Sequence, residues 1–97
     1  MINVSGLKVF PLEVEEVVSG LPSVLECAAV GVPDERAGEA VKLIVVKKDP
    51  ALTEETIRAH CQKNLVAYKR PTHVAFREDL PKSNVGKVLR RLLREAE

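Results

Sequence analysis

The hydrophobic pattern predicts two buried strands near the centre of the chain. Residues 24–32 and 40–46 are near-continuous runs of small and β-branched apolar residues, which is typical of strands buried on both faces. The polar segment between them, 34–38, is expected to be a loop. A shorter strand is expected at 73–76. The start of the chain, residues 2–10, has the pattern of a small hairpin that turns at Ser5-Gly6.

A first helix is expected to begin near Pro11, because the fixed φ of proline suits the first helical position. It is expected to end at Ser19-Gly20 or at Pro22. Helical spacing places its apolar positions on one face; these are Leu12, Val14, Val17, Val18 and Leu21.

Two further helices follow. Thr53 is a suitable N-cap for the second, since its hydroxyl can accept a hydrogen bond from a free N–H of the first turn. Ile57, Cys61 and Leu65 recur every fourth residue, which indicates a face packed on the sheet. The third helix begins near Lys87, with Val88, Leu89, Leu92, Leu93 and Ala96 on its inner face. The prediction is an α+β fold, a small mixed sheet with three helices in a single compact domain.

Composition narrows the classes of function. The chain has 97 residues, of which 45% are hydrophobic and only 3% aromatic, so the core must be aliphatic. A net charge of +1 and the lack of Trp disfavour nucleic-acid binding. The longest apolar run, 43–46, is too short to cross a membrane, and no secretion leader is expected. Two cysteines fit a reducing compartment, although a single disulfide stays open, and they make a poor zinc set.

Charge is unevenly distributed. Residues 1–67 carry a net charge of −3 and residues 68–97 a net charge of +4. The basic segment is either a solvated helix face or a surface that contacts phosphate. If the basic segment contacts phosphate, one weaker hypothesis is a small nucleic-acid-binding protein that uses Arg90, Arg91 and Arg94.

The most suggestive chemical segment is 81–87, in which a polar loop ends in Gly86-Lys87 at the start of a helix. Free N–H groups and the positive end of a helix dipole attract anions, and a lysine adds a full charge there. The segment lacks the spacing of a P-loop. An ordinary loop with an exposed lysine is the alternative.

Other candidates are weaker on pattern alone. The turn at 5–8 allows a ligand to approach its backbone, but it also fits a plain hairpin turn. The loop at 68–71 sets two cations beside Tyr68, which suits a diphosphate or an exposed loop. His60 and His73 are expected to be packed or solvated rather than catalytic.

Four segments together resemble the C-terminal domain of the adenylate-forming acyl-CoA synthetase superfamily, in particular bacterial long-chain fatty acid–CoA ligases. They occur in the order and spacing of that family. The four are the stretch after the family's hinge (3–6 and 9–15), the central strands and loop (28–34 and 38–41), the Tyr-Lys-x-Pro loop (68–71), and the terminal lysine motif (80–87 and 89–91).

The resemblance implies a two-step ligase. A fatty acid carboxylate attacks the α-phosphate of ATP, and the thiol of CoA then displaces AMP after the small domain has rotated. Lys87 matches the catalytic lysine of the first step. Gly6 matches the glycine that lines the pantetheine tunnel in the second step, with Ser5 beside it. Cations in or near segments that contact CoA in relatives are Lys8, Arg36, Lys69 and Arg70.

The resemblance also implies a partner. The family's large N-terminal domain, with its phosphate loop, acyl pocket and Mg²⁺ ligands, is absent from this sequence, so the chain alone is expected to be inactive and to hold no metal or cofactor. The full enzyme is expected to be cytoplasmic, with at most peripheral contact at the inner membrane face. The alternative is a stand-alone module that binds CoA or a carrier protein.

Overall fold

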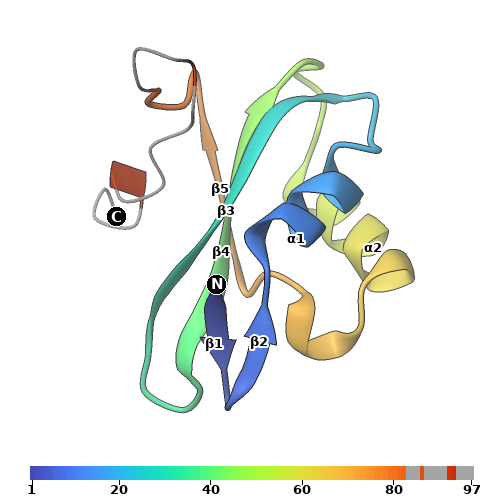
Figure 1. Cartoon of the computed structure of the whole chain (residues 1–97). Helices are drawn as coiled ribbons and strands as arrows, with labels where there is room; N and C mark the ends of the chain where they lie inside the picture. The colour runs from blue at the N-terminus through green and yellow to red at the C-terminus, as the bar shows by residue number, and fades with distance from the viewer. Residues whose placement is uncertain (83–85, 87–91, 94–97) are drawn as a thin grey trace.

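The computed structural model describes residues 1–82, Gly86 and residues 92–93. These residues form a five-stranded sheet with two helices against one face (Figure 1). No helix in this described part is long and apolar enough to cross a membrane. The elements in chain order are β1 (Ile2–Val4), β2 (Leu7–Val9), α1 (Pro11–Val18), β3 (Val24–Asp34), β4 (Gly38–Lys47), α2 (Glu54–Asn64), the 3₁₀-helix η1 (Ala67–Lys69) and β5 (His73–Arg77).

Strand β4 is the centre of the sheet. It pairs along its length with β3 in an antiparallel hairpin. Its other edge pairs with β1 at Val4↔Gly38 and, further along, with β5 in parallel from Lys42↔His73 to Val46↔Arg77. The sheet is therefore mixed, as expected from the sequence, although every other pairing among the described strands is antiparallel.

Alternate residues of β4 point into two separate apolar clusters. Val41, Leu43 and Val45 pack with α1 and α2, whereas Ile44 and Val46 pack on the opposite face with Leu80 and Leu93. This is the period of two expected for a strand. Burial on both faces explains why the run is apolar throughout.

A bulge in β3 changes which residues face the helices. The register shifts between Val24 and Glu26, and an extra residue in one strand reverses the alternation beyond it. Val24 and Ala29 consequently pack in the same cluster, although one is even-numbered and the other odd-numbered. Leu25, at the bulge, is 58% exposed.

Helix α1 begins at Pro11 as predicted, and Ser19 is its C-cap. Val14 and Val18 are buried, but the inclusion of Leu12 in the buried face was wrong, since its side chain is 62% exposed. Two residues along a helix turn by about 200°, so Leu12 lies nearly opposite Val14.

Two side chains attach the helices to their surroundings. The Glu15 carboxylate accepts a hydrogen bond from the backbone N–H of Ala29 at 2.8 Å, on the side of β3 that faces away from β4. His60 of α2 lies 2.7 Å from the carbonyl oxygen of Val17. The histidine is packed between the helices, as expected.

Helix α2 is capped as predicted, since the Thr53 hydroxyl accepts a hydrogen bond from the backbone N–H of Thr56. Ile57 and Cys61 are buried against the sheet. Both cysteines are free.

Several predicted boundaries need correction. The two central strands are longer than expected, and the loop between them is confined to residues 35–37, because backbone pairing continues through Asp34↔Gly38. Residues 67–69 form a 3₁₀-helix instead of a loop. The described part contains two α-helices, not three. The third predicted helix falls largely outside the described residues; of its predicted positions, Leu92 and Leu93 are described, and both are helical.

Two leucines on neighbouring strands test this core. Leu43 is fully buried and Leu25 is 58% exposed. Leu43→Ala should lower the free energy of unfolding by about 3 kcal/mol, because it removes buried apolar area and leaves a cavity. Leu25→Ala should change it by less than about 1 kcal/mol. Urea unfolding measures both, and equal losses would contradict the assigned faces of β3 and β4.

Candidate functional site

The hairpin between β1 and β2 turns through Ser5 and Gly6, which both have positive φ, 52° and 84°. Two-residue hairpin turns with both central residues at positive φ match the twist of the strands. Glycine adopts this conformation freely, whereas serine does so at a cost. Both residues are exposed. Apart from Gly6 itself and its two chain neighbours, no described residue has an atom within 4 Å of the position that a Cβ of Gly6 would occupy.

This turn is joined to the loop between β3 and β4. The backbone N–H of Ser5 donates to the carbonyl oxygen of Ala37 at 2.8 Å. Asp34 shapes the loop, because its carboxylate accepts hydrogen bonds from the N–H groups of Arg36 and Ala37. The structure therefore brings Ser5 and Gly6 next to the loop that carries Arg36, at one end of the sheet (Figure 1).

Lys8 and Arg36 are both exposed at this end of the molecule. Lys8 lies opposite Asn3 in the β1–β2 pairing. The guanidinium of Arg36 has no hydrogen-bond partner among the described residues. Neither side chain has a hydrogen bond or ion pair with another described residue that binding a ligand would break.

Lys69 has an internal partner. Its ammonium group donates to the carboxylate of Glu13 at 2.8 Å, which joins η1 to α1. That hydrogen bond raises the pKa of Lys69 above its ordinary value. The pair therefore stabilises the fold below the ordinary lysine pKa, and this contribution is lost as pH rises through the raised value.

Arg70 is also engaged internally. Its guanidinium donates to the carbonyl oxygens of Leu65 and Gln62, at 2.9 and 3.1 Å, and so binds the C-terminal end of α2. A cation is favourable there, because the helix dipole is negative at that end. The local structure thus gives Arg70 a structural role that the sequence prediction had not assigned to it.

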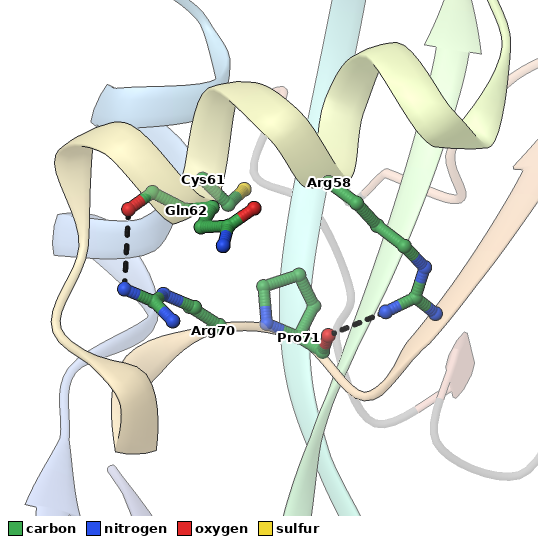
Figure 2. A pocket seen from close by; sticks show the side chains of 5 residues that line it. All are labelled: Arg58, Cys61, Gln62, Arg70 and Pro71. Carbon is green, nitrogen blue, oxygen red and sulfur yellow. Dashed lines mark hydrogen bonds between the residues drawn. The ribbon is translucent and has the colours of Figure 1, made fainter.

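Arg70 lines a pocket of about 180 Å³ between α2 and the 67–71 segment (Figure 2). Arg58 lies at the other side of Pro71, and its guanidinium binds Glu54 and the carbonyl oxygens of Pro71 and Thr72. Both arginines hold backbone in place. The pocket is lined by Arg58, Cys61, Gln62, Arg70 and Pro71.

The cysteine thiols are poorly suited to chemistry. Burial raises the pKa of Cys61, and the guanidinium of Arg58 opposes this shift only in part. Burial likewise raises the pKa of Cys27, whose thiol donates to the carbonyl oxygen of Glu15. The thiolate is the nucleophile, so both cysteines are suited to packing.

Lys87 lies outside the described residues. Two positions near it are described: Lys82 forms an ion pair with Glu26, and Gly86 has a φ of 83°. Glycine adopts this left-handed conformation without the steric cost that other residues have.

Two residues at the hairpin end escaped the sequence analysis as candidates. The side-chain oxygen of Asn3 accepts a hydrogen bond from the N–H of Gly6, and Glu39 accepts one from the N–H of Asn3. Asparagine is common in turns because its side chain can hydrogen-bond nearby backbone groups. Nothing in the local sequence around Glu39 pairs it with Asn3.

Comparison with known proteins identifies the class. Residues 13–87 match the family model of the AMP-binding enzyme C-terminal domain. The chain belongs to this family.

The named relatives agree with the resemblance of the four sequence segments. The chain is 59% identical to a long-chain-fatty-acid–CoA ligase of Escherichia coli O6:H1. The matched 95 residues are 98% of this chain but only 17% of that relative. A ligase of the same name from Yersinia pestis is 57% identical over 97 residues, again with 17% of its length covered. The chain thus spans about a sixth of these relatives.

Solved structures support the fold. A fatty acyl CoA synthetase of Mycobacterium tuberculosis superimposes with a TM-score of 0.93 at 41% identity, over 99% of this chain and 19% of that one. The o-succinylbenzoate CoA synthetase of Bacillus subtilis gives the same TM-score at 28% identity, over 99% of this chain and 20% of that one.

Substitution of Arg70 and of Arg36 tests which of the two arginines stabilises the fold. Arg70→Lys keeps the charge but loses the forked contact to two carbonyl oxygens, so it should lower the free energy of unfolding by about 1 kcal/mol. Arg36→Lys, the matched control, should change it by less than about 0.5 kcal/mol. Urea unfolding of both variants measures the difference. If Arg70→Lys has no effect, the cap at the end of α2 does not stabilise the fold.

Proposed function

We propose that this chain is the mobile C-terminal domain of an ATP-dependent fatty acyl-CoA ligase. The observation that carries the proposal is 59% identity to a named long-chain-fatty-acid–CoA ligase across nearly the whole chain. The reaction has two steps. A carboxylate attacks the α-phosphate of ATP and releases pyrophosphate, and the CoA thiol then displaces AMP from the acyl-adenylate.

Lys87 is assigned to the first step. The attack brings two anions together, and a lysine that bridges the acyl oxygen and the α-phosphate offsets their repulsion. At about 4 Å and an effective dielectric of about 20, one such charge pair is worth about 4 kcal/mol before desolvation. A lysine on a movable domain delivers this charge in one step and withdraws it in the next.

The hairpin end is assigned to the second step. Gly6 presents backbone without a side chain, which leaves room for the pantetheine arm of CoA. Lys8 and Arg36 are the exposed cations beside it and suit the phosphates of CoA. Lys69 and Arg70 are weaker candidates for that contact, because Glu13 and the carbonyl groups of α2 already occupy them.

Magnesium is not assigned to this chain. Among the described residues, no three His, Cys, Asp or Glu side chains come together as metal ligands. In this proposal the large preceding domain of the ligase supplies the Mg²⁺ site, the acyl pocket and most of the ATP contacts.

A chimera tests the proposal. Residues 1–97 replace the matching segment of the Escherichia coli relative, and each half-reaction is measured separately. Lys87→Gln should reduce adenylation at least about 100-fold, because the bridging charge is lost. Thioester formation from preformed acyl-adenylate should persist. Lys63→Gln, an exposed lysine of α2, is the control and should alter neither rate. Equal loss of both half-reactions would refute this assignment of Lys87.

The isolated chain separates this function from a stand-alone CoA-binding module. A ligase domain should bind CoA only weakly, with a Kd above about 1 mM, since the large domain supplies much of the contact. It should also form no acyl-CoA from fatty acid, ATP and CoA. Calorimetric titration of the 97-residue chain with CoA measures the affinity. A micromolar Kd would favour the binding module instead.

A further inference from the structure

The Ser5–Gly6 turn needs support to keep its shape. Ser5, with a φ of 52°, is the one residue other than glycine at positive φ among the described residues. Left-handed backbone at such a residue is unfavourable on its own. The turn is exposed, so contacts from elsewhere must select its conformation.

Asn3 supplies one such contact from inside the hairpin. Its side-chain oxygen accepts a hydrogen bond from the N–H of Gly6 at 2.9 Å. The hydrogen bond spans the turn and fixes the direction of the Gly6 peptide group. Asn3 is itself exposed, so no packing requirement accounts for an amide side chain at this position.

Glu39 anchors Asn3 to the sheet. Backbone pairing between β1 and β4 is recorded at Val4↔Gly38. One residue further along each strand, the Glu39 side chain accepts the N–H of Asn3 at 2.8 Å. Together with the Ser5 N–H bond to Ala37, this attaches the β1 side of the turn to the start of β4 and to the residue just before it.

The opposite strand leaves space for this anchor. A Cβ at Gly31 would lie 2.7 Å from a carboxylate oxygen of Glu39 and 3.3 Å from Ile2. Glycine at this position of β3 lets the Glu39 carboxylate lie against the backbone, within reach of Asn3. The hydrogen bonds thus connect the sheet to Gly6 through Glu39 and Asn3.

We propose that Asn3 and Glu39 are positioning residues for the thioester-forming step. They hold the Ser5–Gly6 turn in the one conformation that admits the pantetheine arm, without touching CoA themselves. The inference rests on the proposed function. If it holds, the apparent affinity for CoA depends on the fraction of molecules in which the turn has this conformation. The rate of adenylation does not depend on that fraction.

The first test measures the turn in the 97-residue chain. In Asn3→Ala, the Gly6 amide should exchange with solvent faster and shift in the NMR spectrum. Asn3→Asp keeps an acceptor oxygen and should restore protection. Unchanged Gly6 exchange in Asn3→Ala would overturn the inference, because the turn would then hold itself.

The second test uses the chimera described above. Asn3→Ala should raise the KM for CoA about fivefold, the equilibrium factor of one typical intramolecular hydrogen bond. The kcat at saturating CoA and the adenylation rate should stay the same. Asn3→Asp should restore the KM. A general loss of folding would lower both half-reactions instead.

Asp49→Ala is the matched control. It removes an equivalent hydrogen bond, which the N–H of Ala51 donates to the Asp49 carboxylate beyond the far end of β4. Its KM for CoA should match that of the unsubstituted chimera. An active chimera with an unchanged KM in Asn3→Ala, or the same rise in Asp49→Ala, would overturn this inference alone. An unsubstituted chimera that forms neither adenylate nor thioester would overturn the proposed function, and this inference with it.

Discussion

The fold depends on strand β4, which is buried on both faces and paired along both edges. Its side chains alternate between the cluster under the helices and the cluster under Leu80 and Leu93. Its edges carry β3 on one side and β1 and β5 on the other. A strand in this environment has little freedom to shift, because a slip of one residue would exchange the two clusters.

The first half of β4 also positions the segments assigned to function. The hairpin turn is attached through Gly38 and Glu39 and through Ala37 just before them. The 67–72 segment is attached through Val41, whose carbonyl oxygen accepts the N–H of Thr72 at 2.9 Å. A few consecutive residues of β4 therefore set where the Ser5–Gly6 turn and the 67–72 segment lie relative to each other. The domain rotation in the proposed function requires this rigidity, since the ligand contacts must move together.

The sequence predicts the elements better than the site. Continuous apolar runs identify β3 and β4, and Pro11 and Thr53 mark the starts of the helices, because these signals are local. The bulge near Leu25 and the exposure of Leu12 were not predicted, since they depend on how neighbouring elements pack. The site depends on contacts over longer distances. Glu39 is 36 residues from Asn3, and Arg70 could not be recognised as a helix cap until the end of α2 was placed beside it. The family motifs identified Gly6 and Lys87 as candidates, but motifs do not reveal what holds a candidate in place.

The hydrogen bond that the N–H of Ala29 donates to Glu15 lies on an edge strand of the sheet. Strand β3 is last in the order β2-β1-β4-β3, and the N–H of Ala29 points away from the sheet. An unoccupied N–H in such a strand is a template on which another chain can add itself. The carboxylate of Glu15 occupies that donor and brings a negative charge to the same place. Glu15 thereby covers a position at which this edge strand would otherwise offer a free donor to another chain.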